Sequence, residues 1–109
     1  MGEVRGTRAA VVSTEDGFDI ASRVEHTAEV NRLSAMSSSL AALGAIAGEE
    51  SRLGPCRQLV IGAEQGQIVL MQARRADVSL VLSVVAGEDA ITGQLLYYAR
   101  AAVESLERA

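Results

Sequence analysis

Few side chains in this sequence are of the types that usually carry chemistry, and they are scattered along the chain. The single histidine, His26, lies in a polar segment, and no second histidine or cysteine stands near it at a metal-ligand spacing. The single cysteine, Cys56, has one basic neighbour, Arg57, whereas reactive thiols lie among several bases or at helix N-termini. We therefore expect His26 to be a loop residue in water and Cys56 to be a small packing residue in the core or at an interface.

Three consecutive serines, residues 37–39, would act as nucleophiles only beside a base, and neither a Gly-x-Ser-x-Gly elbow nor a placed base accompanies them. In a helix their hydroxyls bond to the preceding turn, so packing is the expected role. The glycine-containing segment 62–66 joins strand to strand, whereas a phosphate-binding loop must open a helix. We therefore predict no catalytic residue, no cofactor, no metal ion and no enzymatic activity.

Two adjacent arginines, Arg74 and Arg75, stand at the tip of an expected polar turn. An arginine in such a place can act in trans on the phosphates of a nucleotide that a partner protein holds. The alternative interpretation, which we favour, is an ordinary solvated turn.

Length and composition indicate one globular domain. At 109 residues the chain can bury a single core, and 49% of its residues are apolar. The net charge of −4 argues against nucleic-acid binding, because domains that bind nucleic acids are usually basic. One cysteine cannot form an internal disulfide, which favours a reducing, cytoplasmic setting. No segment is apolar over a length that would predict membrane insertion.

The segment that organises the predicted fold is residues 33–48, which carries no charge. On a helix it divides into a face of large apolar residues and a face of small ones. Because neither face is typical of a water-facing surface, we expect the large residues to lie on the chain's own sheet and the small ones to meet another molecule. Gly44 and Gly48, spaced as G-x-x-x-G, favour a close approach of another backbone to the small face. The large face comprises Leu33, Met36, Leu40, Leu43 and Ile46.

Apolar periodicity and turn signals predict the order β-β-α-β-β-β-α. Asp16-Gly17 is a hairpin signal, and Thr27 is a suitable N-cap for the long helix. The three later strands are apolar on both faces, which predicts helices on both sides of the sheet. Glu88 and Asp89 are expected in the first turn of the last helix, where the helix dipole favours carboxylates. The expected strands are residues 8–13, 18–22, 57–63, 67–73 and 78–86, and the expected helices are residues 27 to about 50 and 87–106. The inner face of the last helix is expected to comprise Ile91, Leu95, Tyr98, Ala99, Ala102, Val103 and Leu106.

Four segments, in this order, resemble the roadblock/LC7 family, which belongs to the same superfamily as the bacterial MglB proteins. Residues 10–22, AVVSTEDGFDIAS, resemble the opening hairpin of the family, and the helix from residue 32 onward is similar to its small-residue central helix. Residues 58–70, QLVIGAEQGQIVL, resemble the central hairpin. Residues 78–85, with a glycine before the last helix, resemble the closing strand. The resemblance covers about residues 8–106.

The resemblance implies an α+β fold, with a five-stranded antiparallel sheet and helices on both faces, as in profilin and longin domains. It also implies that two chains pair through the central helix and the strand after it, so that two sheets join into one. Family members usually carry a helix before the first strand, and this helix is apparently missing here. We expect a short coil or a truncated first helix at residues 1–7 and a roadblock/LC7-like domain at residues 8–109.

The MglB-like relatives imply a homodimeric scaffold that binds and modulates a small Ras-like GTPase in signalling. Such relatives position the GTPase's own residues and insert no arginine. The alternative is a small-molecule-sensing or general dimerisation domain without a GTPase partner. Pairing is expected to bury the small face of the helix and a strand edge that is otherwise open to aggregation. The expected dimer-interface residues are Ser34, Ser37, Ser38, Ala41, Ala42, Ala45, Gly48, Arg57, Leu59 and Ile61.

Overall fold

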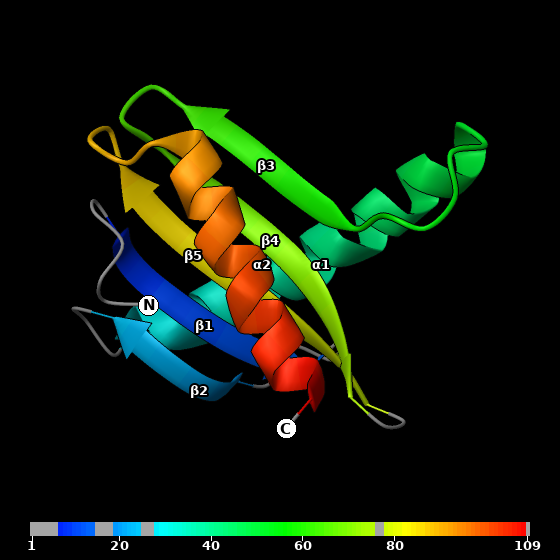
Figure 1. The fold of residues 1–109 in the computed structure, drawn as a ribbon, viewed down its shortest axis with the longest axis horizontal. Coiled ribbons are helices and arrows are strands. Elements are labelled where there is room, and N and C mark those ends of the chain that lie inside the picture. The colour runs from blue at the N-terminus through cyan, green and yellow to red at the C-terminus, as the bar shows by residue number, and fades with distance from the viewer. Residues whose placement is uncertain (1–6, 15–18, 25–27, 76–77, 109) are drawn as a thin grey trace.

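The computed structural model describes residues 7–14, 19–24, 28–75 and 78–108, with side chains described for residues 8–14, 32–74 and 78–108. Its strands form one antiparallel sheet with the spatial order β2-β1-β5-β4-β3, and the two helices lie on opposite faces (Figure 1). The last strand, β5, therefore lies in the middle, between β1 and β4. The elements are β1 (Thr7–Thr14), β2 (Asp19–Val24), α1 (Ala28–Glu50), β3 (Gln58–Ala63), β4 (Gly66–Arg75), β5 (Val78–Gly87) and α2 (Thr92–Arg108).

The second half of the sheet is a meander with tight connections. In the β3–β4 pair Ala63 lies opposite Gly66, so that only two residues form the turn. In the β4–β5 pair the register runs without interruption from Arg75 opposite Val78 to Gly66 opposite Gly87. The short connection at residues 64–65 confirms the tight turn predicted there, and it fixes which side chains share a face of the sheet.

The larger core lies between the sheet and α2. Apolar side chains from β1, β4 and β5 pack against three buried residues of the helix, which recur at every fourth position. This helix lies mainly along β4. The cluster comprises Ala10, Val69, Met71, Ala73, Leu80, Leu82, Val84 and Ala86 of the sheet and Leu95, Ala99 and Val103 of α2.

The opposite face of the sheet carries a smaller apolar cluster of Ala9, Val11 and Leu33, with the half-buried Val85 against it. Here α1 crosses β2, β1 and β5 obliquely, and its C-terminal half extends beyond the sheet (Figure 1). None of the described helices is long and apolar enough to cross a bilayer.

The predicted fold class, five strands covered by helices on both faces, needs correction in how the sheet is covered. The helix-covered body of the sheet has four strands, β2-β1-β5-β4. The strand β3 is an edge strand, and neither helix packs extensively against it. The physical reason is the placement of the helices. The helix α2 packs along β4, and α1 extends beyond the sheet after crossing β5.

Two predictions for the last helix were also wrong. The helix begins at Thr92, because the Ala90 amide donates to the Gly87 carbonyl oxygen at 3.1 Å and closes a turn before it. Glu88 and Asp89 therefore lie in this turn and not in the first turn of the helix. Ile91 and Tyr98, expected on the inner face, are 64% and 43% exposed.

Some sequence predictions fall outside the described residues. These are the Asp16-Gly17 hairpin turn, His26, the Thr27 N-cap and most of the expected coil at residues 1–7. For Arg75 the backbone is described as the end of β4, but the side chain is not.

Candidate interaction surface

The inner face of α1 is made of its small residues, joined to the sheet by a polar seam. Ser34 and Ser37 are 0% exposed. The Ser37 hydroxyl donates to the Leu33 carbonyl oxygen at 2.7 Å and shares a hydrogen bond with the Ser83 hydroxyl of β5. Ser13 of β1, which lies on the same face of the sheet as Ser83, is also fully buried. The hydroxyls of Ser13 and Ser34 have no hydrogen-bond partner within the described part of the chain.

The two glycines of the G-x-x-x-G spacing make room for the loop that follows α1. A Cβ added at Gly44 would lie 3.0 Å from the Cys56 Sγ atom, and one added at Gly48 would lie 2.2 Å from the Gly54 carbonyl oxygen. A side chain at either position would therefore displace this chain's own loop. The pair was expected to allow the close approach of another molecule's backbone. Within this chain, Gly48 is met by the backbone of Gly54 and Gly44 by the side chain of Cys56.

The C-terminal end of α1 is capped by a Schellman motif with a non-glycine residue in the left-handed position. The Leu53 amide donates to the Gly48 carbonyl oxygen at 2.9 Å, and the Arg52 amide donates to the Glu49 carbonyl oxygen at 3.0 Å. Arg52 has a φ of 59°, a conformation that glycine adopts more readily. The cap turns the chain back along the helix, so that Gly54 passes over Gly48.

The outer face of α1 presents large apolar side chains to solvent. Met36, Leu43 and Ile46, which we call the apolar stripe, are 50%, 61% and 54% exposed. The exposed residues between them, Ala35, Ser39 and Ala42, are small and uncharged. Residues 33–48 contain no charged side chain. Because a solvated helix face normally carries charges, this surface is typical of one that packs against another protein.

The apolar stripe corrects the prediction for the central helix. The large residues were expected on the chain's own sheet, but only Leu33 is buried there, and Leu40 is half-buried. Small side chains let the helix axis approach the strands closely, and Ser83 offers a hydroxyl partner to Ser37. The large side chains consequently point outward.

The edge strand β3 is the second open element. It pairs with β4 on one side only, so the backbone groups of its other edge are open to a partner strand. Val60 is 40% exposed, and Leu59 and Ile61 are half-buried. Short or charged edges discourage pairing with other chains, whereas residues 58–63 carry no charge.

The ten residues predicted at the dimer interface occupy different environments. Ser34 and Ser37 are buried inside the chain and have no surface for a second copy, while Gly48 is half-buried under its own loop. Ala42 and Arg57 are exposed. The half-buried members are Ser38, Ala41, Ala45, Leu59 and Ile61. Sequence reasoning did not predict that Met36, Leu43 and Ile46 face outward, and the available signal was Ser83, a serine between apolar residues in the middle of β5.

Two other residues singled out in the sequence, Cys56 and Arg74, lie within the described part of the chain. Cys56 is a half-buried free thiol whose Sγ atom lies 3.4 Å from the Gln58 carbonyl oxygen. Arg74 is exposed, and its backbone amide donates to a Glu107 carboxylate oxygen at 3.0 Å. Among the described residues, no group of three or more His, Cys, Asp or Glu side chains is placed to hold a metal ion.

Comparison with known proteins gives consistent matches to one family. The family model described as Roadblock/LC7 domain matches residues 1–85. No curated protein sequence matches the chain significantly.

Solved structures share the fold over nearly the whole chain. A roadblock/LC7 domain from Streptomyces avermitilis is 25% identical with a TM-score of 0.88, covering 98% of this chain and 88% of that one. The gliding protein MglB from Thermus thermophilus is 20% identical with a TM-score of 0.84, covering 98% and 79%. An MglB with a tetrameric arrangement is 20% identical with a TM-score of 0.83, covering 98% and 79%.

Proposed function

Because the chain belongs to the roadblock/LC7 domain family, we propose that it forms a homodimer that binds and modulates a small Ras-like GTPase. The observation that carries the proposal is the apolar stripe, a row of exposed large side chains on a helix face without charge. The protein acts in the cytoplasm as a regulatory scaffold and has no catalytic role of its own.

The dimer part of the proposal rests on two features of one chain, the apolar stripe and the open edge of β3. Two copies of the apolar stripe that pack against each other remove about half of each large side chain from water. Burial of such side chains stabilises an interface by roughly 25 cal/mol per Å² of apolar area. A two-fold axis can also bring the open edges of two β3 strands together and satisfy their free backbone groups.

The proposed dimer interface differs from the one expected from the sequence. Its helical part is the apolar stripe with Ala42 between the large residues, in place of the buried Ser34 and Ser37. Its strand part keeps β3, with Leu59 and Ile61 beside the edge. The tetrameric arrangement of an MglB with the same fold supports assembly from copies of one chain.

The GTPase part of the proposal rests on the resemblance to MglB-like members of the family, which implies control of a partner GTPase by positioning the partner's own residues. The resemblance also implies that no arginine is inserted into the partner, so the proposal assigns no finger role to the exposed Arg74. A scaffold of this kind needs a binding surface of fixed conformation, and it needs no nucleophile or general base.

An affinity capture tests the GTPase part. The purified chain is immobilised and exposed to lysate of the native organism supplemented with GDP or with a non-hydrolysable GTP analogue. The proposal expects a P-loop GTPase among the bound proteins, with one nucleotide state enriched. Capture of no GTPase in either state, by a chain that is dimeric in solution, would contradict the GTPase role and leave a dimerisation domain.

A further inference from the structure

A second surface lies on the α2 side of the molecule, apart from the apolar stripe. A groove of about 420 Å³ runs between α2, the end of β4 and the residues that lead into β3. Its floor is apolar and includes Met71 and Val103, which are almost completely buried. The groove forms because α2 packs along β4 and does not cover β3.

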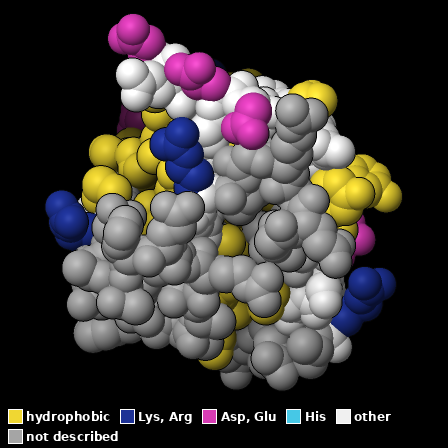
Figure 2. Space-filling view, turned by 90° about the vertical axis from the view of Figure 1, so that its left-hand side faces the viewer, with side chains coloured by type: hydrophobic (Ala, Val, Ile, Leu, Met, Phe, Trp, Pro, Cys, Tyr) yellow, Lys and Arg dark blue, Asp and Glu magenta, His cyan; other side chains and the backbone are white. Residues whose placement is uncertain are grey.

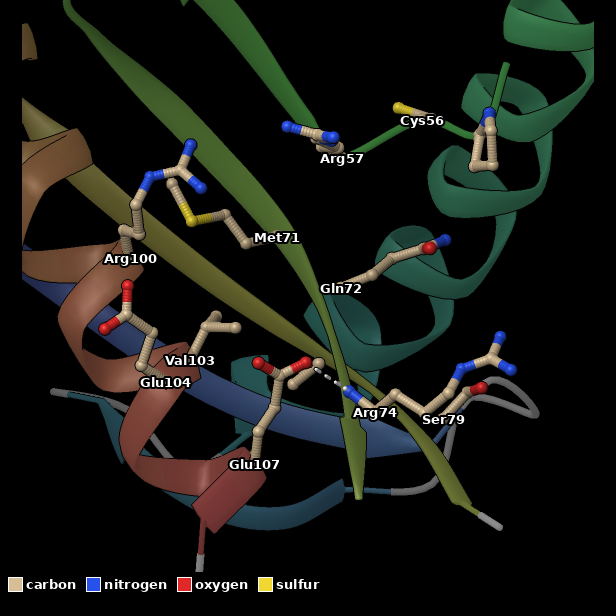
Figure 3. A pocket seen from close by; sticks show the side chains of 12 residues that line it. Cys56, Arg57, Met71, Gln72, Arg74, Ser79, Arg100, Val103, Glu104 and Glu107 are labelled. Atoms are coloured by element: carbon tan, nitrogen blue, oxygen red, sulfur yellow. Dashed lines mark hydrogen bonds between the residues drawn. The ribbon is translucent and has the colours of Figure 1, made fainter. Parts of the chain in front are cut away.

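Two arginines from distant parts of the sequence meet at one end of this groove. Arg57 precedes β3 and Arg100 belongs to α2, and both line the same hollow. Figure 3 shows their side chains pointing toward each other above Met71. The Arg100 Nη2 atom donates to the Gln58 Oε1 atom at 2.7 Å, so a neutral amide holds this side chain across the gap between α2 and β3.

Neither arginine has an acidic partner among the described residues, although the chain contains 14 acidic and only 10 basic residues. Two positive charges that face one hollow repel each other, and an anion placed between them removes that cost. Guanidinium groups bind carboxylates with directed, charge-assisted hydrogen bonds. An unpaired arginine pair over an apolar floor is therefore suited to a carboxylate with an apolar neighbour.

The charge at the other end of the groove restricts the ligand. Glu104, Glu107 and Arg74 line that end, and a Glu107 oxygen is 3.0 Å from the Arg74 amide nitrogen (Figure 3). A polyanion such as a nucleic acid or a phosphorylated lipid would meet these carboxylates and be repelled. A peptide with an acidic side chain next to apolar ones matches the arginine end and the floor of the groove.

Three of the described acidic side chains lie far from the arginine end of the groove. The β3–β4 turn and the β5–α2 turn lie at the opposite end of the sheet and carry Glu64, Glu88 and Asp89, all exposed. Figure 2 views that end of the molecule and shows acidic side chains along its upper rim.

We propose that this groove binds an acidic segment of a partner protein, with a carboxylate held between Arg57 and Arg100 and an apolar side chain on Met71 and Val103. This site goes beyond the proposed dimer and GTPase role, because it uses neither the apolar stripe nor the open backbone edge of β3. Of the ten residues first expected at the dimer interface, it includes only Arg57. It gives the protein a second docking surface, on the face opposite α1.

The test uses the full chain labelled with ¹⁵N and two capped peptides, acetyl-Leu-Glu-Leu-Glu-Leu-amide and its glutamine counterpart. The glutamate peptide is expected to shift the amide signals of residues 56–58 and 100–104. Arg57→Gln and Arg100→Gln are each expected to weaken its binding about tenfold, the value of one charge-assisted hydrogen bond. Arg108→Gln, which changes an exposed arginine of α2 outside the groove, is expected to leave the binding unchanged.

Several outcomes would overturn the assignment. Equal shifts from the glutamine peptide, or full binding by both groove variants, would exclude a carboxylate site at the two arginines. The same shifts from inorganic phosphate at equal concentration would indicate a general anion site and not a peptide groove. Sedimentation of both variants at the wild-type mass is expected, and it separates failure of this site from failure of the proposed dimer.

Discussion

The Ser37 hydroxyl of α1 is hydrogen-bonded to the Ser83 hydroxyl of β5, and both groups are fully buried. Because the Ser37 proton is given to the Leu33 carbonyl oxygen, Ser83 is the donor in this pair. The contact ties the small face of the helix to the middle of the sheet, and it leaves the apolar stripe on the outside.

The serine pair yields a prediction about stability. Ser37→Ala should lower the free energy of unfolding by about 1–2 kcal/mol, because it leaves the Ser83 donor buried and unpaired. Replacing both serines by alanine should cost less than Ser37→Ala alone, since no orphaned hydroxyl remains. Urea unfolding at one protein concentration measures these values, with the exposed Ser39→Ala as control. Additive losses in the double variant would contradict the pairing.

The glycines of α1 and α2 allow a matched comparison. Gly48→Ala should destabilise the protein by about 1–3 kcal/mol despite the better helix propensity of alanine, because its Cβ would overlap the Gly54 carbonyl. Gly93→Ala, in the first turn of α2, meets no atom within 4 Å and should be neutral or stabilising by up to about 1 kcal/mol. Thermal unfolding of the two variants compares them directly. Similar behaviour of both would argue against the close passage of the loop over α1.

The Schellman cap predicts a stabilising substitution. Arg52 holds a φ of 59°, and glycine removes the steric cost of the left-handed conformation. Arg52→Gly should therefore raise the free energy of unfolding by about 0.5–1 kcal/mol, after the entropy that glycine adds to the unfolded chain is subtracted. Chemical denaturation provides the measurement, and Arg32→Gly, within α1, serves as a control that should destabilise. A loss of stability in Arg52→Gly would contradict the assigned cap.

Local signals in the sequence were sufficient to place most elements. The apolar runs and the short polar turns near Glu64 and Gly66 locate β3, β4 and β5 to within a few residues. The orientation of α1 could not be derived in this way. Large apolar residues are expected to face a core, but a helix that lies close to strands does so through small residues, and only the buried Ser83 hinted at that packing.

The groove could not be predicted from local sequence patterns, because its two arginines are more than forty positions apart in the sequence. Arg57 and Arg100 come together only because α2 lies along β4, next to the uncovered β3. No local sequence pattern predicts that the edge strand β3 is covered by neither helix. Long-range placement of this kind depends on the whole packing arrangement and not on any single segment.

In the proposed dimer, the apolar stripe of α1 joins two copies of the chain. Sedimentation equilibrium of the wild type and of Leu43→Arg tests it most directly, with Tyr97→Arg on α2 as the matched change of another exposed large side chain. We expect twice the mass of one chain for the wild type and Tyr97→Arg, and the mass of one folded chain for Leu43→Arg. A Leu43→Arg protein that keeps the wild-type dimer mass, or a wild type that sediments as a single chain, would contradict it.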